Sequence, residues 1–131
     1  MECFIFEAAE KCLGVETEYI YRIADDIQII PVPLAPPCYR GLSYFRGDLF
    51  DVIDLGSLMG GERSLLSGNP YIILLKWGQR KLGLIPDKII GITRIEENNG
   101  SQTVFTEEGR TTELIMPEKI WKILSELPYG P

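Results

Sequence analysis

Residues 31–55, PVPLAPPCYRGLSYFRGDLFDVIDL, constrain the fold of this chain more than any other stretch. Four prolines within residues 31–37 fix φ and remove backbone donors, which excludes a helix or a central strand there. Two Arg-Gly pairs, the second beginning at Arg46, then flank a short strand over residues 42–45, with a turn-permissive glycine at each end. Because a second apolar strand follows over residues 49–54, we expect a rigid, shaped edge that holds Arg46 in place.

The composition favours one compact globular domain over residues 1–131. Of these residues, 45% are hydrophobic and 24% are charged, which is enough for a substantial core. The longest apolar run, residues 71–75, is too short to span a bilayer, and the N-terminus lacks a basic region followed by an apolar one. We therefore expect neither membrane insertion nor a secretory signal. Thirteen glycines and nine prolines favour short strands joined by tight turns.

The charge and the missing residue types argue against several classes of function. Thirteen Lys and Arg residues against nineteen Asp and Glu residues give a net charge of −6, whereas nucleic-acid and anionic-lipid surfaces need clustered positive charge. The chain has no histidine, which removes the commonest general base and most zinc sites. Its three cysteines show neither metal nor redox spacing, so we expect a reduced, cytoplasmic protein without a cofactor or a metal.

Hydrophobic patterning predicts roughly nine or ten short strands and two or three small helices. The expected helices are one that Thr17 caps and that includes Ile23, a brief turn capped by Asp54, and one that begins at Pro117. A turn is expected at residues 98–100. The spacing is typical of small barrels or of a sandwich, and the strand count alone does not choose between them. The expected extended segments cover residues 3–8, 12–15, 27–30, 42–45, 49–54, 71–77, 81–85, 88–95, 103–106 and 111–116.

The order of proline, Arg-Gly, Arg-Gly and Asp-Leu in residues 31–55 resembles the signature of the CheW family, the adaptor proteins of bacterial chemoreceptor arrays. The resemblance continues through residues 77–87, WGQRKLGLIPD, and residues 4–6 and 14–23 fit the opening strands and first helix of the family. It implies a mainly β fold: two small five-stranded SH3-like β-barrels packed around a shared core, with a few short helices including a C-terminal one.

The same resemblance implies a function without chemistry. The protein would be a non-enzymatic adaptor in chemotaxis-type signal transduction that couples a chemoreceptor to a CheA-type histidine kinase. Its partners would be the regulatory domain of that kinase and the cytoplasmic helical hairpin of a methyl-accepting receptor. The adaptor would be cytoplasmic and recruited to membrane-associated receptor arrays.

Two partner-binding sets follow from the resemblance. The edge that contacts the kinase would comprise Arg46, Gly47 and Leu49. The groove that receives the receptor helix would comprise Ile20, Leu82, Gly83 and Ile89. The apolar members of the groove set have a second interpretation, because side chains of this kind also fill a hydrophobic core.

One departure from the family pattern concerns charge. The family commonly has a glutamate, well placed to pair with the arginine at this turn, where this chain has Arg22. Since two arginines cannot neutralise each other, either Arg46 pairs with another acid, for which Asp48, Asp51 and Glu18 are the candidates, or Arg22 points elsewhere. Arg22 also keeps open a divergent CheW-like regulator of a non-flagellar motility pathway or of another two-component pathway.

A small enzyme is the alternative from a different class. Asp51, Asp54 and Asp87 are carboxylates set among apolar strands, and Cys38 offers a thiol. Paired carboxylates can perform acid–base chemistry. The structural interpretation is favoured, with Asp54 as a helix cap, Asp87 as a turn or strand-end residue, and Cys38 as a packing side chain.

A third alternative is a peptide-binding β-barrel of the SH3 kind, which recognises an extended or proline-rich ligand. Such a protein needs an exposed groove lined by aromatic side chains. In this chain Tyr39, Tyr44 and Tyr71 would have to lie together on the surface. The position of these three tyrosines therefore tests this alternative.

Overall fold

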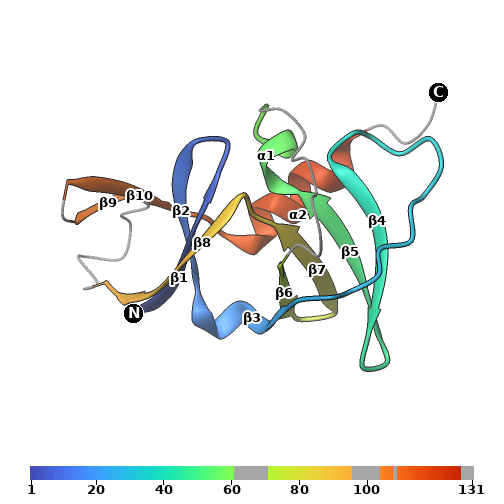
Figure 1. The fold of residues 1–131 in the computed structure, drawn as a ribbon, viewed down its shortest axis with the longest axis horizontal. Helices are drawn as coiled ribbons and strands as arrows, with labels where there is room; N and C mark the ends of the chain where they lie inside the picture. Colours follow the sequence, from blue (N-terminus) through green and yellow to red (C-terminus); the bar gives the residue numbers. More distant parts are fainter. Residues whose placement is uncertain (61–70, 96–103, 108, 128–131) are drawn as a thin grey trace.

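Two five-stranded β-sheets and one C-terminal helix make up most of the protein (Figure 1). The computed structural model describes residues 1–60, 71–95, 104–107 and 109–127. Sheet A contains, in spatial order, β8 (Lys88–Arg94), β1 (Glu2–Ala8), β2 (Lys11–Glu16), β10 (Arg110–Leu114) and β9 (Val104–Glu107). Sheet B contains β3 (Ile20–Ala24), β6 (Ile72–Trp77), β7 (Arg80–Ile85), β5 (Asp48–Asp54) and β4 (Tyr39–Phe45). The helical segments are the 3₁₀ turn η1 (Thr17–Tyr19), α1 (Leu55–Leu58) and α2 (Pro117–Glu126).

The predicted pair of five-stranded units is confirmed, but the sheets are not closed barrels. In the described part of the chain, no hydrogen-bonded ladder joins β3 to β4 in sheet B or β8 to β9 in sheet A. Side chains bring the ends of sheet B together instead. The ring of Tyr21 on β3 lies 6.1 Å from the centroid of Phe45 on β4 and 6.1 Å from that of Phe50 on β5. Sheet B is therefore rolled by aromatic contacts between its first and last strands.

The two sheets share one core, as predicted. Strand β6 shows how this arises, because successive side chains of a strand point to opposite faces. Ile73 and Leu75 face the core shared by both sheets, whereas Ile72 and Leu74 face a second cluster inside sheet B. The shared core consists of Phe4, Phe6, Ala8, Leu13, Val15, Ile53, Leu55, Ile73, Leu75, Leu82, Leu84, Ile120 and Leu124.

Helix α2 connects the two sheets. It follows β10 of sheet A, and its buried Ile120 and Leu124 enter the shared core. Pro117 occupies the first turn, where a missing N–H costs nothing. The predicted C-terminal helix is thus confirmed, and Figure 1 shows it lying between the two sheets.

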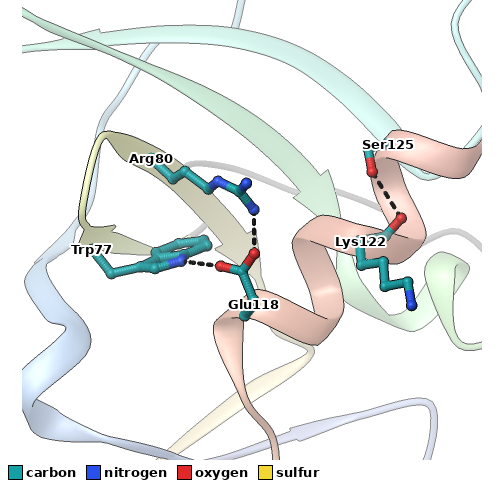
Figure 2. Close-up of polar contacts among 5 residues, drawn as sticks. All are labelled: Trp77, Arg80, Glu118, Lys122 and Ser125. Carbon is teal, nitrogen blue, oxygen red and sulfur yellow. Dashed lines mark hydrogen bonds and ion pairs between the residues drawn. The ribbon is translucent and has the colours of Figure 1, made fainter.

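A polar and aromatic cluster fixes α2 on the β6–β7 hairpin of sheet B (Figure 2). Glu118 accepts a hydrogen bond of 2.7 Å from the indole Nε1 of Trp77 and pairs with the guanidinium of Arg80. The ring of Trp121 meets Trp77 edge-on at 6.0 Å, and the Arg80 Cζ lies 5.2 Å from the Trp121 centroid. One carboxylate at the start of α2 therefore ties the helix to both ends of the hairpin turn.

The helix predicted to follow Thr17 is wrong. Residues Thr17–Tyr19 form a single 3₁₀ turn, and Ile20–Ala24 form strand β3, which pairs antiparallel with β6. The Thr17 hydroxyl donates to Glu2 at 3.1 Å and caps no helix. The side chains of β3, with Ile20, Tyr21 and Ile23 among them, are of the β-branched and aromatic types that suit a paired, half-buried strand.

The proline-containing segment crosses β4 very closely. Ile30 and Leu42 exchange two backbone hydrogen bonds, of 2.7 and 2.8 Å. Gly41 has φ +133°, and a Cβ atom there would lie 2.0 Å from the Ile30 carbonyl oxygen. The first Arg-Gly pair therefore contains glycine because no side chain fits under the crossing. The turn predicted at residues 98–100 lies outside the described residues.

Asp48 joins three strands of sheet B. Its carboxylate, at the start of β5, accepts hydrogen bonds from Lys76 of β6 at 2.7 Å and from Lys81 of β7 at 3.0 Å. These bonds stabilise the ionised form, so they lower the pKa of Asp48 below its ordinary value of 3.8. The same contact raises the pKa of Lys76.

We expect replacement of Leu82 by alanine to destabilise the fold strongly. Leu82 is fully buried in the shared core, and a Leu→Ala change at such a site costs about 2–5 kcal/mol. Leu49→Ala is the matched control, because that side chain is 44% exposed and should cost less than about 1 kcal/mol. Urea unfolding measures both. Equal losses in the two variants would contradict the placement of the core.

We expect the stabilising effect of Asp48 to disappear in acid. A carboxylate whose pKa is lowered by folding stabilises the native state above its unfolded pKa, and this stabilisation is lost as the pH falls through the folded pKa. The urea midpoint of Asp48→Asn should therefore lie below that of the wild type at pH 7, and the difference should shrink as the pH falls below 3.8 and through the lowered pKa of Asp48. Asp25→Asn, at an exposed loop position, serves as the control. A difference that persists in acid would show that the lysine contacts are not its cause.

Candidate functional site

The β4–β5 hairpin ends in a tight two-residue turn that presents an arginine to solvent. Phe45 pairs with Asp48, and between them Arg46 and Gly47 have φ values of +49° and +87°. Two successive positive φ values are the mark of a type I′ turn, whose twist matches that of the flanking strands. Glycine adopts this conformation freely, and Arg46 is held in it by the shortness of the loop. The turn predicted at Arg46 and Gly47 is confirmed, and its rigidity stays a prediction.

Arg46 and Arg22 share one aromatic ring. The Arg46 Cζ lies 5.3 Å from the centroid of Phe45, and the Arg22 Cζ lies 5.6 Å from the same centroid. Tyr21 meets Phe45 edge-on and stacks on the buried Phe50 below it. We call Tyr21, Arg22, Phe45 and Arg46 the arginine edge. Both guanidinium groups are thus fixed by cation–π contacts to a ring that itself belongs to the packed interior of sheet B.

The expected acidic partner of Arg46 is not found. Asp48 is occupied by the two lysines, and Asp51 accepts a hydrogen bond of 2.6 Å from the hydroxyl of Tyr39. In the described residues, no ion pair joins Arg46 to these acids or to Glu18. Neither of the two alternatives is found in the described residues: Arg46 has no internal acid, and Arg22 lies against the same aromatic ring as Arg46.

The outer face of the same hairpin is apolar. Leu49 is 44% exposed and lies directly opposite Tyr44, which is 66% exposed. Alternation along the strands places this pair on the face opposite to Phe45 and Asp48. Arg46, Gly47 and Leu49, predicted as one contact edge, thus occur together on one exposed hairpin tip. Their role in binding a partner stays a prediction.

The four residues predicted for the receptor groove lie deeper. Ile20 and Ile89 are half-buried and pack against the shared core, while Leu82 is a full member of that core. A Cβ atom at Gly83 would lie 3.0 Å from the Cγ2 of Ile72, so a side chain there would have to displace its packed neighbours. Leu82 and Gly83 can affect a partner only through the packing of their neighbours, and the groove itself stays a prediction.

Two of the three carboxylates considered for catalysis bind backbone amides. Asp54 is fully buried and caps α1 by accepting from the Ser57 N–H at 3.3 Å, as predicted. Asp87 accepts from the Ala9 N–H at 3.0 Å and so holds the β1–β2 turn, where Ala9 and Glu10 both have positive φ. These carboxylates maintain turns.

Asp51 and Cys38 carry no sign of nucleophilic or acid–base machinery either. Asp51 lines a pocket of about 270 Å³ together with Tyr39, Trp121, Leu124 and Ser125. Neither Asp54 nor Asp87 is among these lining residues, because both bind backbone amides elsewhere. Burial raises the pKa of the Cys38 thiol, which keeps it protonated and unreactive. In the part of the chain that the structure describes, no three potential metal ligands cluster.

The tyrosines needed for a peptide groove do not gather. Tyr39 and Tyr44 lie at opposite ends of β4, five residues apart, which in a strand separates them by roughly 16 Å. Tyr71 precedes β6, and two strands, β7 and β5, separate β6 from β4 in the sheet. The alternative of an SH3-like peptide groove built on these residues is therefore wrong.

Sequence reasoning missed Tyr21 and Phe45 as parts of the site. The sequence signal for these residues was the order Ile20-Tyr21-Arg22-Ile23. This order is compatible with a strand as well as with a helix. Assigning residues 20–24 to an edge strand places Arg22 at one margin of sheet B, but its contact with Phe45 on the other margin also requires the sheet to roll.

Known proteins resemble this chain in sequence and in structure. "Chemotaxis protein CheW" from Thermotoga maritima is 27% identical over 100 residues, which cover 74% of this chain and 64% of that protein. "Protein FrzA" from Myxococcus xanthus is 23% identical over 94 residues, which cover 72% of this chain and 59% of that protein. The chain thus spans slightly less than two thirds of each relative.

A solved structure shows the same fold. The scaffolding protein TtCheW from Thermoanaerobacter tengcongensis superimposes with a TM-score of 0.76 at 23% sequence identity, over 88% of each chain. Residues 2–122 match the sequence profile of the family described as the CheW-like domain. The proline and Arg-Gly segment, the paired five-stranded sheets and the C-terminal helix all lie within or overlap this range. The chain belongs to the CheW-like domain family.

Proposed function

We propose that this protein is a non-enzymatic adaptor that couples a chemoreceptor to a CheA-type histidine kinase. The observation that carries the proposal is the exposed tip of the β4–β5 hairpin, where a rigid turn presents Arg46 without an acidic partner in the described residues. An arginine held in one place offers a preformed fork of donors to a partner's carboxylate or carbonyl groups. The regulatory domain of the kinase would bind this edge through Arg46, Gly47 and Leu49.

Membership of the CheW-like family supports the proposal, and so do the relatives named for chemotaxis and for scaffolding. The helical hairpin of the receptor would lie over Ile20 and Ile89, with Leu82 and Gly83 supporting the floor beneath. Residues 1–131 would act as one domain in the cytoplasm, recruited to membrane-associated arrays. None of the described helices is long and apolar enough to cross a membrane.

Such an adaptor would transmit receptor state by altering how kinase domains are held. Its carboxylates cap helices and hold turns, so the geometry favours contact over chemistry. Individual affinities can then be modest, because each additional contact in an array forms at a high effective concentration.

The charge of Arg22 favours a second candidate within the same class: a regulator of a non-flagellar motility pathway or of another two-component pathway. Two arginines on one ring present a more positive surface than a neutral ion pair would, and a different kinase would complement it. Pull-down with each kinase of the organism separates the two candidates. Binding to a chemotaxis-type kinase alone supports the first, and binding to another kinase alone supports the second.

We expect Arg46→Glu to weaken kinase binding at least tenfold. The substitution removes the hydrogen bonds that the guanidinium would donate to the kinase. It also places a negative charge opposite the partner's carboxylates, which repel it. Calorimetry with the regulatory domain of a co-encoded kinase measures the effect. Arg94→Glu is the matched control, because it makes the same charge change at an exposed position on β8 of sheet A.

Unchanged binding of Arg46→Glu would assign Arg46 a purely structural role and leave the adaptor function standing. If the wild-type protein bound no such kinase, the coupling function itself would be wrong. Circular dichroism of both variants verifies that the hairpin still folds.

A further inference from the structure

The arginine edge is a concentrated positive surface on an acidic protein. Arg22 and Arg46 lie within 6 Å of the same Phe45 centroid, and the Nζ of Lys76 lies 4.3 Å from the centroid of the adjacent Tyr21. The whole chain, by contrast, carries a net charge of −6. Positive charge is therefore gathered at one place on a molecule that is otherwise rich in acid.

The two arginines are not neutralised within the described residues. Neither Arg22 nor Arg46 forms an ion pair there, and Asp48, which follows the turn, is already bound by two lysines. Because both guanidinium groups contact one ring, their separation is comparable with the screening length of about 10 Å in 0.1 M salt. Their repulsion is thus only partly screened, and it opposes folding of the free protein.

The aromatic contacts hold both arginines in place despite this repulsion. Phe45 is half-buried and meets the ring of Tyr21 edge-on. Tyr21 in turn stacks on the fully buried Phe50. A guanidinium on an aromatic face keeps its outer N–H donors available in the plane of the group. The edge therefore offers two prearranged forks, each of which fits one carboxylate.

We propose that the arginine edge binds an acidic surface of the protein partner, with at least one carboxylate for each of Arg22 and Arg46. This inference rests on the proposed adaptor function and specifies the chemistry of its kinase partner. A protein carboxylate fits better than the phosphates of a nucleic acid or a membrane, because the remaining negative charge of the molecule repels an extended polyanion. The exposed Tyr21 beside the arginines adds an apolar contact of the kind common in protein interfaces.

This proposal predicts opposite effects of one substitution on stability and on binding. Arg22→Glu places a carboxylate near Arg46, which removes the repulsion and neutralises the edge. The urea midpoint of the variant should equal or exceed that of the wild type, while its affinity for the kinase regulatory domain should fall at least tenfold. Arg22→Gln removes the charge without supplying an acid, and its affinity should lie between the two.

Salt dependence distinguishes charge complementarity from a change of shape. The affinity of the wild type should fall steeply between 50 and 300 mM NaCl, and that of Arg22→Glu should change much less. Arg94→Glu carries the same net charge as Arg22→Glu but leaves the arginine edge intact, so its affinity should stay within about twofold of the wild type. Equal losses in the two variants would assign the effect to net charge and overturn the proposal.

A direct probe tests the edge without the kinase. A hexaglutamate peptide should shift the NMR signals of Tyr21, Arg22 and Arg46 in the wild type and not in Arg22→Glu.

Kinase binding without any loss in Arg22→Glu would overturn the inference and preserve the adaptor function. If no kinase bound the wild type, a positive peptide titration would uphold the acidic specificity alone. Stronger shifts with anionic vesicles or DNA than with the peptide would replace the protein partner by a phosphate-bearing one.

Discussion

Burial of both faces of the central strands is the constraint on which the structure depends. In β6, Ile73 and Leu75 face the core shared by the two sheets, and Ile72 and Leu74 face the interior of sheet B. On the next strand, β7, a side chain at Gly83 would have to displace the side chains of Ile72, Val52 and Leu74 that already pack on that face. A strand that is buried on both sides cannot slip by one residue without exchanging its two apolar sets. The register of sheet B, and with it the position of the β4–β5 hairpin, is therefore fixed from within.

The arginine edge depends on this packing. Phe45 lies at the margin of the interior of sheet B, so a ring anchored by packing orients two cations outside it. The turn contributes the rest, since positive φ values at Arg46 and Gly47 leave the hairpin tip few conformations. A surface prepared in this way loses little conformational entropy when it binds. The β6–β7 hairpin, whose turn lies at the same end of sheet B, is secured differently, by Glu118 of α2 between Trp77 and Arg80 (Figure 2).

The parts of the fold that local chemistry determines could be predicted from the sequence. The turn at Gly47, the cap at Asp54 and the start of α2 at Pro117 each follow from backbone rules. The close crossing of the proline segment over Gly41, which lies within β4, was not predicted. Strand β3 could not be separated from a helix, because its pairing with β6 is a tertiary contact that overrides the cap offered by Thr17. The central place of β7 in sheet B likewise buries Leu82, which the family resemblance assigned to a groove and for which a core position was the second interpretation. The contact of Arg22 with Phe45 depends on the rolling of the sheet, which no local pattern contains.

The arrangement of sheet A has a consequence for synthesis on the ribosome. Strand β1, at the start of the chain, pairs with β8, and the backbone N–H of Ile95 donates to the carbonyl oxygen of Met1. The first strand therefore lacks one of its two neighbours until residue 94 has left the exit tunnel, and β2 waits longer still for β10. Sheet B, whose strands all lie between residues 20 and 85, can be assembled earlier. The apolar residues of β1 must wait in the nascent chain for their partners, which makes β1 the strand of sheet A most in need of protection by a chaperone.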